Sequence, residues 1–418
     1  MKKLLILLCL LLSSCVAVEQ DVAKDIVNSH KKTISRCEIS GFNYAGTDAY
    51  VTKKPILKVL MVHGVGLHHP GYSRRLQENL ANNIGLDVMS RLPKNITLLD
   101  PKDHKTHIGN LQITYWQNLD ASKQMLFYEL TWSEITTPDK QIIAFDTTEQ
   151  YSKFRVPFNN MMKKFLDNTL PDPLIYLVDK NNLILDSANQ SICWLLKTNW
   201  QNIPNNQAQV CNLDLYDGIE RFTSDNVLFV THSLGSKILM DSITRNAEAV
   251  SAAEKQPQTL RQKQLTEKLK NKEITVFMLA NQLPILQIGH PLPQVHNQIR
   301  NYCRVNGDKY NRRIFKHVNI VAFSDPNDIL SYAIPQPFVD KYIDSRICPL
   351  VTNVSVNVAP EISAFGIGIV NPVAAHTDYD NNAEVINLMT RGTDDFTADD
   401  ALNQRCHYVR LKNDNGMK

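Results

Sequence analysis

Apolar runs with abrupt ends alternate along this chain with stretches whose apolar positions recur at helical spacing. The runs are rich in β-branched, aliphatic and aromatic residues, which suit buried strands. Strands alternating with helices indicate an α/β fold, with a mostly parallel central sheet and helices on both faces. The predicted strands lie at 57–62, 226–230 and 318–323, further sheet or core segments lie at 126–133 and 275–286, and helical patterns begin near 235, 245 and 383.

Residues 226–235, NVLFVTHSLG, combine a predicted strand with a tight turn and the start of a helix. Ser233 lies at the tip of the turn. This is the layout of a nucleophile elbow, which lifts a serine hydroxyl out of the sheet and points a helix N-terminus at developing negative charge. Small residues two positions on either side let the helix approach the strand. Here they are Thr231, where glycine is usual, and Gly235.

A second motif lies upstream, where the apolar run of LKVLMVHGVG ends at His63 and Gly64. Gly64 and Gly66 allow the backbone to turn so that an amide can face a reacting group. The Val65 amide, paired with the amide of Leu234, is the predicted oxyanion hole. The alternative is a buried strand followed by an ordinary glycine turn.

Two further candidates follow Ser233 in the chain. The predicted strand that starts at residue 318 runs into the turn Asp-Pro-Asn-Asp, which offers Asp325 and Asp328 as acids. His376 follows small residues in a polar stretch that we interpret as a loop before the last predicted helix, and it is the candidate base. The alternative is that both aspartates only form the turn.

In this order, the oxyanion loop, Ser233, Asp328 and His376 resemble the α/β-hydrolase superfamily, whose triad runs Ser, Asp, His along the chain. The resemblance covers roughly residues 55–392. It implies Asp328 rather than Asp325 as the triad acid, because the aliphatic residues and serine after Asp328 match the family's pattern after its seventh strand. It also implies acyl transfer through Ser233 with no cofactor and no metal, and it leaves the substrate open.

The chain starts with a short positive segment, Met-Lys-Lys, followed by a run of nine apolar residues and Leu-Ser-Ser-Cys. This pattern is typical of a secretory signal peptide, and the run is too short to span a bilayer. It resembles a bacterial lipoprotein signal, which implies cleavage after residue 14 and acylation of Cys15. The alternative is an ordinary signal peptide. Val16, in place of aspartate, favours the outer membrane over the inner membrane.

Cysteine content and charge agree with an exported enzyme. Six cysteines remain after Cys9 and Cys15 are set aside, and an even number in an exported chain permits three disulfides. Proximity in sequence suggests Cys193 with Cys211 and Cys303 with Cys348, which leaves Cys37 with Cys406, among fifteen possible arrangements. The net charge of +3 gives no indication of nucleic-acid binding.

The hydrophobic fraction of 43% in 418 residues favours one large decorated domain. We divide the chain into a signal peptide (1–14), a lipidated leading segment (15–54) and a hydrolase domain (55–418) with a lid or cap insertion around 135–220. Within that insertion, an amphipathic stripe at 151–165 is more typical of core than of a lipid-binding surface. Oligomeric state has no signature in the sequence.

A membrane-tethered hydrolase meets lipid at high local concentration. We therefore expect a serine esterase or lipase that cleaves carboxyl esters, with lipid or phospholipid acyl esters as first choice. This substrate prediction rests on the expected membrane location and on analogy with the fold. A thioesterase or peptidase on the same fold, or a non-catalytic envelope lipoprotein, are the alternatives.

Overall fold

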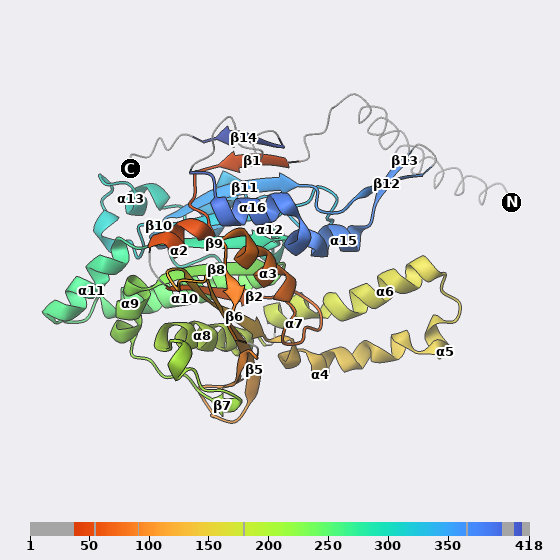
Figure 1. Cartoon of the computed structure of the whole chain (residues 1–418), viewed down its shortest axis with the longest axis horizontal. Helices are drawn as coiled ribbons and strands as arrows, with labels where there is room; N and C mark the ends of the chain where they lie inside the picture. The colour runs from red at the N-terminus through yellow and green to blue at the C-terminus, as the bar shows by residue number, and fades with distance from the viewer. Residues whose placement is uncertain are drawn as a thin grey trace, which may run out of the picture.

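A twelve-stranded mixed sheet crosses the molecule (Figure 1). The computed structural model describes residues 37–53, 56–90, 92–178, 180–364, 367–394 and 405–411. The strand order is β14-β1-β11-β10-β9-β8-β2-β6-β5-β4-β7, and β3 pairs with β5. The strands are β1 (Cys37–Gly41), β2 (Ile56–Val62), β3 (Asp87–Val88), β4 (Lys94–Leu99), β5 (His107–Gln117), β6 (Gln124–Thr131), β7 (Gln207–Gln209), β8 (Asn226–His232), β9 (Glu273–Leu279), β10 (His317–Ser324), β11 (Pro349–Val356) and β14 (Cys406–Arg410).

The central strands from β6 through β2, β8, β9 and β10 to β11 run parallel. The predicted strands at 57–62, 226–230 and 318–323 are present, and the α/β architecture with a mostly parallel sheet is confirmed. The segment 275–286 is a strand only as far as Leu279, after which Leu283–Leu286 forms the short helix α12. The chain enters this parallel block at β2, next to the edge strand β6, and then adds β6 on one side and β8, β9, β10 and β11 on the other. In open α/β sheets, ligand sites lie outside the carboxyl ends of strands at such a reversal.

Helices cover both faces of the sheet, and the central strands bury apolar residues on both of their sides. In β2, Leu57, Val59 and Met61 belong to one core cluster, and Leu60 and Val62 belong to the other. The first cluster includes residues of α2 (Thr47–Lys53), α3 (Arg74–Asn83) and α16 (Ala383–Arg391). The second includes residues of α8 (Asn181–Lys197), α9 (Leu215–Ser224), α10 (Gly235–Ala253), α11 (Leu260–Lys270), α12 (Leu283–Leu286) and α14 (Gln336–Tyr342). The short helices α13 (Ile299–Cys303) and α15 (Pro372–Thr377) complete the described α-helices outside the projection considered next.

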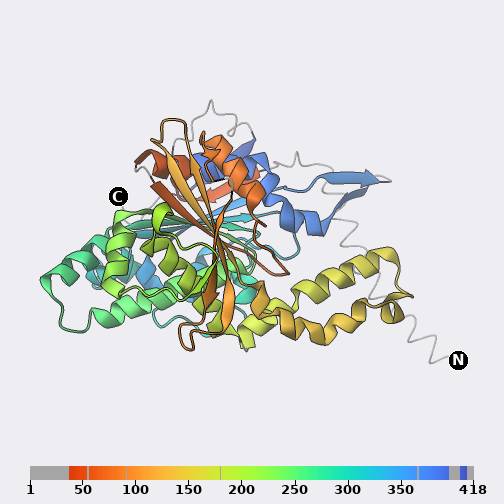
Figure 2. The same cartoon turned by 60° about the horizontal axis from the view of Figure 1, so that its bottom comes forward.

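Residues 137–178 form a helical projection that extends from the body of the molecule (Figures 1 and 2). We call it the arm. It contains α4 (Thr137–Lys140), the 3₁₀-helix η2 (Gln141–Thr147), α5 (Glu149–Ser152), α6 (Pro157–Thr169) and α7 (Pro171–Val178). A hairpin of β12 (Glu361–Ala364) and β13 (Ile367–Val370) projects toward the same side. The rest of the segment 135–220 packs with the body, since α8 lies in the core and β7 joins the sheet.

The amphipathic stripe of the arm does not enter the core, so that interpretation is wrong. Phe154 is 88% exposed and Phe158 is 61% exposed. The stripe is also not one continuous helix, since Phe154 lies in the turn between α5 and α6 whereas Phe158 lies in α6.

All three predicted disulfides are confirmed. Cys37–Cys406 links β1 to β14, Cys193–Cys211 links α8 to the segment before α9, and Cys303–Cys348 links α13 to the start of β11. Within the described part of the chain, no helix is both long enough and apolar enough to cross a bilayer.

Candidate functional site

Ser233 follows the last residue of β8 directly, and α10 begins two residues later. Its φ of 54° lies in the left-handed region, which is uncommon for a residue with a Cβ. The Ser233 amide donates to the Leu279 carbonyl at 2.9 Å, so the end of β9 holds the turn in place. Strain of this kind persists only where surrounding contacts enforce it, and it concentrates at functional sites.

The turn lies tightly against the end of β2, and glycine makes this approach possible. A Cβ on Gly235 would lie 2.3 Å from the Val62 carbonyl oxygen, and one on Gly64 would lie 2.4 Å from the Ser233 Cβ. Both distances are shorter than any real Cβ contact. The two motifs found in the sequence, LKVLMVHGVG and NVLFVTHSLG, therefore meet at the carboxyl ends of neighbouring parallel strands.

The structure brings Asp328 and His376 together. Nδ1 of His376 donates to Oδ2 of Asp328 at 2.8 Å, and both side chains are buried. The amide of Leu330 donates to the other carboxylate oxygen at 2.9 Å, which fixes the orientation of the carboxylate. With its proton on Nδ1, a neutral His376 keeps a free lone pair on Nε2, as a general base requires.

Asp325 has different partners. Its Oδ1 accepts from the Asn327 amide at 2.7 Å, and its Oδ2 accepts from the Val358 amide at 2.7 Å. It therefore ties the turn after β10 to the segment after β11, as a capping residue does.

His376 lies in the short helix α15, not in the polar loop that the sequence suggested. Asn371 accepts from the amides of Val373 and Ala374, and Pro372 occupies the first turn. An N-cap asparagine followed by proline is a helix start, and this signal was available in the sequence.

Two polar atoms of the cluster are buried without a hydrogen-bond partner among the described residues. They are Oγ of Ser233 and Nε2 of His376. Buried polar atoms are normally satisfied, so an unsatisfied pair next to a strained turn indicates a functional site. Because both atoms are shielded from solvent, a substrate reaches them only after neighbouring side chains move.

The loop after β2 is held by His63. Nε2 of His63 accepts from the Trp132 amide at 3.0 Å, so Nδ1 carries the proton and donates to the Gly64 carbonyl at 2.7 Å. Burial lowers the pKa of His63 well below its usual value, which keeps this arrangement neutral. In a trans peptide the C=O and the next N–H point in opposite directions, so the Val65 amide points away from the His63 ring.

Neither the Val65 amide nor the Leu234 amide donates a hydrogen bond to another described residue. The first belongs to the loop that contacts Ser233, and the second belongs to the residue immediately after it. Two free amides in these positions can stabilise negative charge on an oxygen near Ser233.

Sequence reasoning missed two neighbours of His376. Nε2 of His232 donates to the His376 carbonyl at 2.8 Å, which ties α15 to the end of β8. Burial, and secondarily the proximity of the His376 imidazole, lowers the pKa of His232 to about 3. The Tyr379 hydroxyl accepts from the Asp325 amide at 2.7 Å and lies 3.5 Å from Oδ2 of Asp328. Only the position of His232 next to Ser233 offered a signal.

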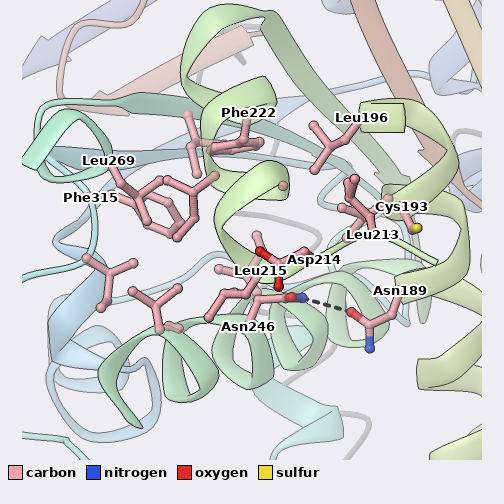
Figure 3. Close-up of a pocket in the computed structure, with 18 of the residues that line it drawn as sticks. Asn189, Cys193, Leu196, Leu213, Asp214, Leu215, Phe222, Asn246, Leu269 and Phe315 are labelled. Carbon is pink, nitrogen blue, oxygen red and sulfur yellow. Dashed lines mark hydrogen bonds between the residues drawn. The ribbon is translucent and has the colours of Figure 1, made fainter. Parts of the chain in front are cut away.

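A separate apolar pocket of about 290 Å³ lies between α8, α9, α10 and α11 (Figure 3). Leu196, Phe222 and Phe315 are among its lining residues. At its edge, Asn246 donates to Asn189 at 2.8 Å. None of the predicted site residues lines this pocket, so it is distinct from the cluster around Ser233.

Cys15 lies outside the described residues. Within the part of the chain that is described, no group of three or more His, Cys, Asp or Glu side chains is arranged to hold a metal ion. Comparison of the chain with known proteins finds no matching family model, no matching curated protein and no matching solved structure.

Proposed function

We propose that this protein is a serine hydrolase with an α/β-hydrolase fold that cleaves carboxyl esters, and that Ser233, His376 and Asp328 are its triad. The observation that carries the proposal is the pair formed by His376 and Asp328, which is tied to the turn of the strained Ser233 through His232. His232 directly precedes Ser233 and donates to the His376 carbonyl, while Nε2 of His376 and Oγ of Ser233 are both buried and without a hydrogen-bond partner among the described residues. A binding protein has no need for this combination of a base, its orienting acid and a strained hydroxyl.

In the proposed reaction, Nε2 of His376 takes the proton from Ser233 while Oγ attacks the ester carbonyl carbon. The amides of Val65 and Leu234 hold the resulting oxyanion. When the tetrahedral intermediate collapses, the bond to the alcohol oxygen breaks, and His376 returns the proton to the leaving alkoxide. Water then repeats the sequence against the acyl-enzyme and releases the acid, with Asp328 stabilising the imidazolium in both halves.

Lipid acyl esters are the proposed substrates, supported by the apolar surface of the arm. Its exposed side chains include Phe145, Tyr151, Phe154, Val156 and Phe158. Apolar groups of this size rarely gather on the surface of a soluble monomer without a partner, and an acyl-chain surface is one such partner. In this proposal the arm is the lid, and acylation of Cys15 places the enzyme in the bacterial envelope, in the outer membrane.

Labelling with a fluorophosphonate tests the triad directly. We expect wild-type protein to label and the variant Ser233→Ala to lose both labelling and esterase activity, because loss of a triad nucleophile costs on the order of 10⁴-fold to 10⁶-fold in turnover. Ser236→Ala is the matched control, since Ser236 is a buried serine in the first turn of α10, three residues after Ser233, and contacts Thr231 at 3.0 Å. Labelling that persists in Ser233→Ala refutes the proposal.

A substrate panel distinguishes the alternatives. Acyl p-nitrophenyl esters of increasing chain length, phospholipid vesicles, acyl thioesters and peptides are compared on the same protein. We expect turnover of esters and phospholipids to exceed turnover of peptides and thioesters. The reverse ranking assigns the triad to a thioesterase or peptidase, and no turnover together with no labelling assigns the protein to the non-catalytic class.

A further inference from the structure

The arm supplies a carboxylate that accepts a hydrogen bond from the loop that follows β2. Oδ2 of Asp172, on α7, accepts from the Gly66 amide at 2.6 Å, and the Asp172 side chain is fully buried. Gly66 has a φ of 98°, a conformation that side-chain-bearing residues rarely adopt. The backbone at Gly66 is therefore held by glycine and by a carboxylate 106 residues further along the chain.

This contact fixes one side of Val65, and His63 fixes the other. Nδ1 of His63 holds the carbonyl of the peptide before Val65, and Asp172 holds the amide of the peptide after it. Each peptide is planar, so holding one of its polar atoms limits the rotation of the whole unit. The Val65 N–H lies in the first of these two planes, which His63 holds. Asp172 holds the second plane and so restrains the rotation about the Val65 backbone that relates the two planes.

The carboxylate of Asp172 is satisfied by groups at the base of the arm. Lys140, on α4, approaches Asp172 at 2.7 Å, and the Thr136 hydroxyl donates to Oδ1 at 2.6 Å. Burial raises the pKa of Asp172, and the ion pair with Lys140 acts in the opposite direction. Burying a charge without partners is costly, but the Asp172 carboxylate has a cation, a hydroxyl and an amide as partners. These contacts offset the cost of its burial and fix its position.

We propose that Asp172 is a positioning residue that, together with His63, sets the direction of the Val65 amide and so couples the base of the arm to the oxyanion hole. The inference rests on the proposed function, because it gives the Val65 amide a role in the reaction. Lys140 and Asp172 come from the two ends of the arm, so a change in the separation of α4 and α7 alters the acceptor offered to Gly66. The conformation of the arm then affects turnover at Ser233 through this contact.

The test compares full-length wild type with Asp172→Ala, which removes the acceptor, and with Asp172→Asn, whose amide oxygen can still accept from Gly66. Asp146→Ala is the matched control, since Asp146 forms its ion pair with Arg155 elsewhere on the arm. Active sites are counted with a fluorophosphonate, and kcat per titrated site, KM and inhibition by a trifluoromethyl ketone are measured. Such a ketone binds as an anionic hemiketal, so its affinity reports on the oxyanion hole.

We expect Asp172→Ala to lose about tenfold to a hundredfold in kcat per titrated site, because removal of a whole oxyanion donor costs about 10²-fold to 10³-fold. Ketone affinity falls in parallel and KM changes little, whereas Asp172→Asn recovers most of the loss and Asp146→Ala matches wild type. A purely structural role lowers the number of titrated sites and leaves kcat per site unchanged, and that result overturns the inference while the proposed function stands.

Two further outcomes are separable. If wild-type protein does not label, the proposed function fails first and this inference fails with it. If Asp172→Ala yields no folded protein, Thr136→Val removes only one partner of the carboxylate. It is then expected to show the same pattern at smaller amplitude, with lowered kcat and ketone affinity at constant KM. Unchanged kcat and ketone affinity in that variant contradict the coupling.

Discussion

Nδ1 of His376 lies 2.8 Å from Oδ2 of Asp328, and this contact joins α15 to the turn after β10 across 48 residues of sequence. The second carboxylate oxygen is held by the Leu330 amide, so the acid cannot rotate away from the histidine without losing a hydrogen bond. Asp325, three residues earlier, is directed to backbone amides instead. The two aspartates of one turn therefore have different tasks, and this difference can be measured.

We expect Asp328→Asn to lower turnover far more than Asp325→Asn. The asparagine amide would face Nδ1 and favour the wrong tautomer of His376, an effect worth about 10⁴-fold in a comparable triad. Asp325→Asn instead weakens hydrogen bonds to backbone amides and should lower stability with a smaller effect on turnover per folded molecule. Turnover of one soluble ester, normalised to titrated sites, makes the comparison. The opposite ranking transfers the role of acid to Asp325.

The sequence was most informative where a local pattern carries the physics. An apolar run that ends at glycine or serine has few options besides a buried strand and a tight turn, so β2, β8 and β10 could be predicted. Residues at the carboxyl ends of neighbouring parallel strands then lie close together, which is why Gly64 and Ser233 meet.

Other features depend on contacts that no local pattern contains. Asp172 and Gly66 are 106 residues apart, and no spacing rule connects them. The stripe on the arm illustrates a different limit, because helical periodicity shows that apolar residues share a face but not whether that face is covered. Here the predicted helix is also interrupted, because Phe154 lies in the turn between α5 and α6, and both Phe154 and Phe158 are exposed, so the prediction of a buried stripe was wrong.

Gly235→Ala is expected to destabilise the protein, because the added Cβ would lie 2.3 Å from the Val62 carbonyl oxygen. Overpacking of this kind typically costs about 1–3 kcal/mol, and a shift of α10 would also displace Ser233. Gly218→Ala is the control: the nearest atom to its added Cβ belongs to a Leu213 side chain at 3.6 Å. That change, inside α9, should be neutral or stabilising by up to about 1 kcal/mol. Urea unfolding of both variants tests this, and equal stability of the two contradicts the close approach of helix and strand.

Stability should fall as the pH drops below the ordinary range of histidine. The pKa of His232 is about 3 in the folded protein, mainly because of burial, and a histidine in the unfolded chain titrates near 6.5. Between these values the unfolded chain binds a proton that the folded protein does not, so the free energy of unfolding decreases as the pH falls. Each such group contributes a slope of about 1.4 kcal/mol per pH unit.

His232→Asn removes this titration and keeps a side-chain donor for the His376 carbonyl. We expect its free energy of unfolding to depend less steeply on pH than that of wild type, by about one proton between pH 6 and 4. The pKa values of His63 and His68 are also lowered mainly by burial. The free energy of unfolding of the variant therefore still decreases somewhat as the pH falls. Parallel curves for the two proteins would show that His232 does not titrate in this way.

Acylation of Cys15 predicts that wild-type protein, expressed with its own leader, partitions with membranes and incorporates a labelled fatty acid. Cys15→Ser should do neither, because buried acyl chains contribute about 0.8 kcal/mol per CH₂ to membrane binding. Cys9→Ser is the control, since Cys9 lies inside the apolar run of the leader. Hydrolysis of a short soluble ester should be the same in all three proteins. Membrane-bound, labelled Cys15→Ser protein contradicts the lipoprotein assignment.

The arm itself predicts a contribution to lipid binding that is independent of the acyl anchor. Phe154 and Phe158 lie on the arm at one end of the molecule, and Leu260, which is 80% exposed, begins α11 at the opposite end (Figure 1). In a Cys15→Ser background, which removes the anchor, we expect Phe154→Ser with Phe158→Ser to weaken binding to phospholipid vesicles and to slow hydrolysis of their lipids.

The expected loss is on the order of tenfold or more, since burying one phenylalanine side chain contributes about 1.5–3 kcal/mol and each tenfold corresponds to about 1.4 kcal/mol. Turnover of a short soluble ester should be unchanged, because neither phenylalanine belongs to the cluster around Ser233. Leu260→Ser removes an equally exposed apolar side chain from the far end and should leave vesicle binding intact. If Leu260→Ser weakens binding as much as the double variant, general surface hydrophobicity rather than the arm carries the interaction, and the arm loses its place as the lipid-facing element.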